Sequence, residues 1–183
     1  MGQATPFRHH HHTAGLRLRA DASGSVAVEF AMLAPLLLAL IFGVFQAALL
    51  FLTQQGLETA AESAARLVVT GQAQKSGLTS SQFRTAACAG LPPYLSCSNL
   101  YTDVTVVSSY SAATLGVPTF TYDSSGNVTN GFAYNTGGKG AIVVLRVMYL
   151  MPVMGGPGLK LSNQANGTRL MTATAVFKNE IYS

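Results

Sequence analysis

The chain has 183 residues, of which 49% are hydrophobic and 10% are charged, with a mean hydropathy of +0.32 and a net charge of +4. This length accommodates one membrane segment and one domain of ordinary size. The positive charge does not form a nucleic-acid surface, because Arg8, Arg17 and Arg19 precede a long apolar run. Taking these three from the 11 basic residues, and Asp21 from the 7 acidic ones, leaves 8 basic and 6 acidic residues beyond position 24. We therefore expect no nucleic-acid partner.

The first 24 residues hold all four histidines, His9 to His12. A metal site and an expression tag are alternative readings of this run, but a tag is commonly longer, so a low-complexity leader fits it best. If the leader is removed, no histidine remains for Ser-His or Cys-His catalysis or for histidine-based metal binding. The chain also lacks Gly-x-Ser-x-Gly and a phosphate-binding Walker sequence. We predict no catalytic residues, no metal site and no cofactor.

A membrane-length apolar run follows, and residues 31–52 read AMLAPLLLALIFGVFQAALLFL. At about 1.5 Å per residue, a helix over 30–52 spans the roughly 30 Å hydrocarbon core of a bilayer. A secretory signal has a shorter apolar core of about 7–15 residues. The other alternative, a buried core helix that is apolar on all sides, needs a larger domain than this chain offers. We predict a transmembrane helix over 25–53, with the arginine-rich N-terminus in the cytoplasm.

One acid, Glu29, lies at the start of this run, between Val28 and Phe30. An ionised side chain costs roughly 2.5–3.5 kcal/mol at the centre of a membrane helix and less near its ends. Two readings of Glu29 follow: an interfacial acid that reaches water, or an acid kept for a charged partner. Its spacing from Gly24, in the pattern Gly-x-x-x-x-Glu-Phe, favours the second reading.

The helix is predicted to continue past the membrane as an amphipathic segment over 54–72. Its apolar stripe consists of small side chains at helical spacing: Leu57, Ala60, Ala61, Ala64, Ala65, Val68 and Val69. Glu62 and Arg66 lie on the other side of the helix, where their i, i+4 spacing allows a favourable ion pair. Gly71 is predicted to end the helix. We expect the stripe to pack on the chain's own outer domain.

Residues 73–183 are predicted to form an α+β domain outside the cytoplasm. A capping box from Thr79 to Gln82 opens a short helix through about Ala89. Alternating or β-branched residues predict three strands, and a turn cluster at Asp123–Asn127 centres a candidate hairpin. The strands are 101–110, 141–151 and 168–178, the hairpin arms are 119–122 and 128–134, and 155–158 is a loop. The predicted fold is a long helix packed on a small antiparallel sheet.

The two cysteines, Cys88 and Cys97, flank a Gly-Leu-Pro-Pro bend at 90–93. Outside the cytoplasm a disulfide is the default state for such a pair. A pair of free buried thiols is the alternative.

Taken together, Gly24, Ser25, Glu29-Phe30 and the apolar helix resemble the class III signal of type IV pilins in the form found in Flp-type pilins. The longer body resembles the TadE-like pseudopilins of tight-adherence (Flp) secretion systems. The stretches that carry this resemblance are VAVEFAMLAPLLLALIFG, AAESAARLVVTGQAQ, the cysteine pair and TATAVFKNEIY. It covers most of the chain from Gly24 onward, with no recognisable counterpart for 111–140, and implies a pilin-like fold.

The resemblance implies that a prepilin peptidase cuts between Gly24 and Ser25, on the cytoplasmic face of the inner membrane. Cleavage removes the leader and creates an α-amino group at Ser25. In type IV pilins the acid that corresponds to Glu29, followed by Phe30, pairs with the N-terminus of a neighbouring subunit, which offsets the burial of both charges. The implied role is a non-enzymatic component of pilus biogenesis, adhesion and biofilm formation, with the domain 73–183 in the periplasm. Its implied partners are the peptidase, other pseudopilins, the major Flp pilin, the assembly platform and the lipid bilayer.

The alternative function is an uncleaved, single-pass anchored protein whose periplasmic domain binds a ligand or has a structural role. The two hypotheses differ in the first residue of the mature chain.

Overall fold

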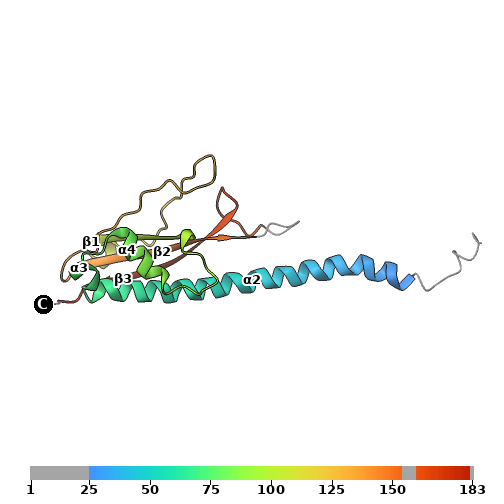
Figure 1. The fold of residues 1–183 in the computed structure, drawn as a ribbon, viewed down its shortest axis with the longest axis horizontal. Coiled ribbons are helices and arrows are strands. Elements are labelled where there is room, and N and C mark those ends of the chain that lie inside the picture. Colours follow the sequence, from blue (N-terminus) through green and yellow to red (C-terminus); the bar gives the residue numbers. More distant parts are fainter. Residues whose placement is uncertain (1–24, 154–159, 182–183) are drawn as a thin grey trace, which may run out of the picture. The chain divides into compact units, whose positions relative to one another are not determined.

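The computed structural model describes residues 25–153 and 160–181 (Figure 1). These belong to two compact units, Met1–Val44 and Phe45–Ser183. The predicted leader and the predicted loop at 155–158 lie outside the described residues. The elements in chain order are α2 (Ser25–Val69), α3 (Gln72–Lys75), α4 (Ser80–Cys88), η2 (Cys97–Asn99), β1 (Leu100–Val107), η3 (Tyr110–Ala112), β2 (Ile142–Pro152) and β3 (Thr168–Lys178).

Helix α2 contributes to both units, and its bounds agree with the predicted continuous helix. It ends shortly before Gly71, whose φ of 72° is the left-handed conformation that terminates helices. The short helix α3 that follows was not predicted, since four residues are too few for a periodic pattern. Helix α4 begins with the predicted capping box, in which Thr79 and Gln82 each satisfy the other's backbone N–H.

The sheet has three strands in the order β1-β2-β3, and both pairs are antiparallel. The predicted strands match β2 and β3 closely, but the prediction of strand to Tyr110 is wrong. Strand β1 ends at Val107, and Ser109 instead accepts a hydrogen bond from the Ala112 backbone N–H to cap η3. A serine that bonds the nearby backbone competes with strand pairing in this way.

Helix α2 runs beside the sheet (Figure 1), and its stripe of small side chains packs against one face of the sheet, as predicted. Because side chains alternate along a strand, β2 presents its odd-numbered residues to this face. The buried residues of this layer include Leu57, Ala60, Ala64, Val68, Phe83, Leu100, Val104, Val143, Leu145, Val147 and Ala173. The observed fold is therefore α+β, with a long helix on a three-stranded antiparallel sheet in a pilin-like arrangement.

The opposite face of the sheet is covered by the irregular segment 113–140. Phe120 from this segment lies at 5.5 Å from Tyr101 and 5.2 Å from Phe132, measured between ring centroids, and packs with Met148 of β2. The candidate hairpin within the segment did not form strands; it has one isolated bridge, Tyr122 with Val128, around the predicted turn. Its aromatic side chains pack on the sheet, and at its end Tyr134 forms an isolated parallel bridge with Val104 of β1.

A buried ion pair joins this segment to the sheet. Asp103 of β1 and Arg146 of β2 are register partners, only 5% and 6% exposed, with 2.6 Å between Arg146 Nη1 and Asp103 Oδ2. Asp103 Oδ1 accepts a hydrogen bond from the Ala133 backbone N–H, and Arg146 Nη2 donates to the Thr114 carbonyl oxygen. The pair thus holds both ends of the covering segment against the sheet.

Gly56 of α2 allows the bend between the cysteines to approach the helix. A Cβ atom at this position would lie 2.5 Å from Cγ and 2.6 Å from Cδ of Pro92. Elsewhere in a helix, glycine-to-alanine substitution stabilises by about 1 kcal/mol. Here we expect Gly56→Ala to destabilise by about 1–3 kcal/mol, because the added methyl overpacks the contact.

Urea unfolding of the full chain in detergent, followed by near-ultraviolet circular dichroism of the tyrosines, measures this change. The variant Gly56→Ala/Pro92→Ala removes the clashing ring atoms and is expected to recover most of the loss. A more stable Gly56→Ala protein would show that the contact does not constrain the helix.

Candidate functional site

The predicted processing and assembly residues lie in the first turns of α2. Ser25 and Glu29 are one helical turn apart on the same face, and the Ser25 hydroxyl donates to Glu29 Oε1 at 3.3 Å. Both side chains are exposed, and Phe30 next to them is 69% exposed. The geometry therefore brings Glu29 next to the residue whose α-amino group cleavage would create. Gly24 lies outside the described residues, so cleavage at its peptide bond stays a prediction.

The helix surface around this site is apolar and uncovered in the first unit. Its most apolar 18-residue window has a mean hydropathy of 2.5, and 11% of that window is buried. The exposed large side chains in this stretch are Val26, Val28, Phe30, Met32, Leu33, Leu36, Leu37, Leu38, Leu40, Ile41, Phe42 and Val44. Such exposure does not fit the core helix of a soluble domain, and it is typical of a single membrane span or a signal sequence.

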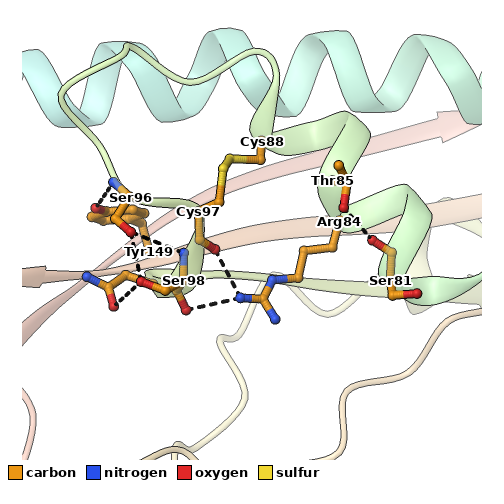
Figure 2. The surroundings of a disulfide bond; sticks show 9 residues. Ser81, Arg84, Thr85, Cys88, Ser96, Cys97, Ser98 and Tyr149 are labelled. Carbon is orange, nitrogen blue, oxygen red and sulfur yellow. Dashed lines mark hydrogen bonds between the residues drawn. A yellow bond between two sulfur atoms is a disulfide. The ribbon is translucent and has the colours of Figure 1, made fainter.

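The structure contains a disulfide between Cys88 at the end of α4 and Cys97 at the start of η2 (Figure 2). Figure 2 shows Arg84 reaching across from α4, where its Nη2 donates to the carbonyl oxygens of Cys97 and Ser98, each at 3.0 Å. The Tyr149 hydroxyl accepts from the Ser96 backbone N–H at 3.1 Å. The disulfide thus links the end of α4 to η2, and β1 begins directly after η2.

This region does not have the geometry of a catalytic site. A shallow depression of about 290 Å³ lies beside the disulfide, lined by Ser81, Arg84, Thr85, Cys88, Cys97 and Ser98. Arg84 is engaged with the two carbonyl oxygens and lies 5.3 Å from the centroid of the Tyr101 ring. The Arg84 cation is thus in use, and among the described residues no carboxylate or imidazole lines the depression, so the contacts seen here are structural ones.

Among the acidic residues elsewhere in the described chain, Asp123 has a structural role. Asp123 closes its turn by accepting from the Asn127 side chain and backbone and from the Ser125 backbone, and these hydrogen bonds lower the pKa of its carboxyl group. Within residues 25–153 and 160–181, no three His, Cys, Asp or Glu side chains gather as a metal site.

Sequence reasoning missed the Asp103–Arg146 pair. The residues lie 43 positions apart, and only the strand register brings them together. One signal was available: each is a charged residue in a strand of mostly apolar or β-branched residues, and buried charges occur in pairs.

Comparison with known proteins bears on the N-terminal site. The model of the family described as TadE-like protein matches residues 24–66, from the predicted cleavage glycine to Arg66 in the packed half of α2. Searches of curated proteins and of solved structures each returned no match. Over the segment 24–66, which contains the site and the apolar helix, the chain is similar to the TadE-like protein family.

Proposed function

We propose that this protein is a minor, pilin-like component of a tight-adherence (Tad/Flp) pilus assembly system. The observation that carries the proposal is the TadE-like match over 24–66, which includes Gly24, Ser25, Glu29 and Phe30. The family is one of pilus assembly proteins and is not known for enzymatic activity. In this role the protein contributes to pilus biogenesis, adhesion and biofilm formation.

Processing by a prepilin peptidase between Gly24 and Ser25 is the first step that we propose. Glycine suits the residue before the cut, because a backbone without a side chain enters a narrow protease cleft most easily. The new N-terminal residue is then Ser25, which begins α2. Cleavage leaves an ammonium group one helical turn from Glu29.

Glu29 then serves as a charge partner during assembly. When the apolar helix enters a bundle of other such helices, an unpaired carboxylate is costly to bury, and pairing with an ammonium group offsets that cost. We propose that Glu29 pairs with the N-terminus of a neighbouring pseudopilin or of the major Flp pilin. Its exposed position on α2 leaves it available to a neighbour.

The proposed location is the bacterial inner membrane, where residues 25–53 cross the bilayer and contact the assembly platform. The N-terminus faces the cytoplasm because Arg8, Arg17 and Arg19 precede the span. The domain 73–183 then lies in the periplasm, an oxidising compartment that suits the Cys88–Cys97 disulfide.

Two substitutions separate processing from assembly. Gly24→Ala is expected to leave the leader in place, because a methyl group obstructs the protease cleft. Glu29→Ala is expected to be processed and yet to lower the number of surface pili by about tenfold or more, since its loss leaves the partner ammonium unpaired. Intact-mass analysis of membrane extracts measures processing, and electron microscopy measures piliation.

Matched controls are Gly43→Ala, a glycine inside the same helix, and Glu180→Ala, an exposed acid in the second unit. Both controls should be processed and piliated normally. If Glu29→Ala cells assemble as many pili as the parent, charge pairing at Glu29 is wrong. Unprocessed protein in cells that carry the peptidase would instead favour the uncleaved anchored protein.

A further inference from the structure

The two edge strands of the sheet, β1 and β3, differ in whether another segment of the chain covers them. The outer edge of β1 is covered by the segment 133–135, where the Val104 N–H donates to the Ala133 carbonyl oxygen at 2.8 Å and the Asn135 N–H donates to the Val104 carbonyl oxygen at 2.9 Å. The other edge is β3, which pairs only with β2 in the three-stranded sheet. An uncovered strand edge presents backbone donors and acceptors to another chain.

Alternate residues of β3 direct their backbone groups away from β2. Leu170 exchanges two hydrogen bonds with the Asn163 side chain, and the Thr172 carbonyl oxygen accepts from Gln54 Nε2 at 3.2 Å. Thr174 and Val176 continue this alternation. In the described residues, no hydrogen bond is made to the outward N–H and C=O groups of these two residues.

This open stretch also lacks the usual protection of an edge. Proteins commonly place charged residues or proline where an edge would otherwise recruit strands. Here residues 173–177 read Ala-Thr-Ala-Val-Phe, with Arg169 and Lys178 only toward the two ends of the strand.

A groove of about 320 Å³ lies along this edge, between α2 and β3, which run side by side (Figure 1). Its lining is Gln54, Glu58, Ala61 and Glu62 from α2 and residues 172–175 from β3. Glu58 and Glu62 are exposed, and Glu62 does not form the expected ion pair with Arg66, since the ion pair within the described residues is Asp103–Arg146. The lining therefore combines the unpaired outward backbone groups of Thr174 with two carboxylates, of which Glu58 also accepts from Gln54 Nε2 at 3.0 Å, and it includes no basic side chain.

We propose that this groove binds an extended, basic segment of another polypeptide, which adds to the sheet as a strand beside β3. The spacing of the charges supports this occupant. Glu58 and Glu62 are four residues apart on a helix, about 6 Å along its axis. Side chains at i and i+2 of a strand are about 6.6–6.8 Å apart on one face. Two Lys or Arg residues in alternate positions thus match the two carboxylates, while backbone hydrogen bonds to Thr174 and Val176 provide the pairing.

A second copy of this chain is a poorer occupant. Antiparallel pairing of β3 with itself reverses the direction of the neighbouring α2, whereas two copies anchored in one membrane run in the same direction. This comparison rests on the proposed membrane anchoring; the binding measurement below does not.

The test uses the full chain in zwitterionic detergent micelles and a fluorescent, acetylated heptapeptide in which lysine alternates with threonine and valine. A peptide with glutamate in place of lysine, and a lysine peptide N-methylated at alternate amides, are the comparisons. Fluorescence anisotropy measures affinity, and amide hydrogen exchange measures protection of Thr174 and Val176. We expect the lysine peptide to bind about tenfold tighter than the glutamate peptide at low salt, the scale of two exposed ion pairs. It should also slow exchange at both amides.

Matched variants separate the two parts of the site. Glu58→Gln/Glu62→Gln is expected to abolish the preference for lysine over glutamate. Thr174→Pro removes an outward N–H, which an edge strand tolerates, and is expected to abolish binding, while Thr174→Val keeps the N–H and should bind normally. The proposal would be overturned if the parent protein bound the lysine and glutamate peptides with equal affinity. It would also be overturned if Thr174→Pro bound the lysine peptide as tightly as the parent does, or if the parent bound the N-methylated peptide as tightly as the unmethylated one. Concentration-dependent protection of Thr174 without peptide would assign the edge to a second copy and contradict it as well.

Discussion

Replacing Asp103 by alanine is expected to lower the free energy of unfolding of the second unit by about 3–5 kcal/mol. The substitution leaves the Arg146 guanidinium buried and without its carboxylate, and it also removes the acceptor of the Ala133 N–H. Arg146 Nε already lacks a partner among the described atoms, so the remaining charge is poorly compensated. Domains have total stabilities of about 5–15 kcal/mol, so this loss is a large fraction of the whole.

Urea unfolding of the full chain in detergent measures the loss, and a double substitution shows its origin. Asp103→Leu/Arg146→Met replaces both charges by apolar side chains and should be much closer to the parent protein than either single variant. The segment 113–140 should also become sensitive to limited proteolysis in Asp103→Ala, because the pair holds both of its ends. A loss below about 1 kcal/mol would mean that the pair is solvated and does not hold this segment.

The second large effect is expected at Phe83, whose side chain is fully buried between α4 and the rest of the core. Its ring centroid lies 5.4 Å from that of Tyr134, so it joins α4 to the segment beside the edge of β1. Phe83→Ala is expected to cost about 3–5 kcal/mol, the sum of lost apolar burial and the cavity left behind. The same unfolding measurement applies.

Tyr94 supplies the control for Phe83. It is an aromatic residue in the neighbouring bend but is 59% exposed, so Tyr94→Ala should change stability by less than about 0.5 kcal/mol. Phe83→Leu retains most of the apolar volume and should lose less than Phe83→Ala. Equal losses for Phe83→Ala and Tyr94→Ala would contradict the packing seen at α4.

The helices and strands that the sequence predicted well are those with strong local signals. Helix α2 combines an apolar run with a 3.6-residue stripe and a terminal glycine, and α4 begins with a capping box. Strands β2 and β3 are rich in β-branched or alternating residues. Each signal arises from neighbouring residues, so a single sequence carries it.

The features that were missed depend on which strands pair and on how they are aligned. The Asp103–Arg146 pair needs the register of β1 with β2, and the open edge of β3 needs the order of the three strands. The segment 113–140 has neither the 3.6-residue period of a helix nor the two-residue period of a strand. Aromatic packing on the sheet determines its course. For the N-terminal site, the helical spacing of Ser25 and Glu29 was predictable, whereas the neighbour that Glu29 meets belongs to another chain.

The most direct test of the central claim is the first residue of the mature protein. The full-length gene is expressed in cells with and without a functional prepilin peptidase, and the protein is extracted from membranes for intact-mass analysis and N-terminal sequencing. With the peptidase, we expect a chain that begins at Ser25; without it, we expect a chain that keeps residues 1–24. A chain that still begins before Gly24 in the presence of the peptidase would contradict the assignment to pilus assembly.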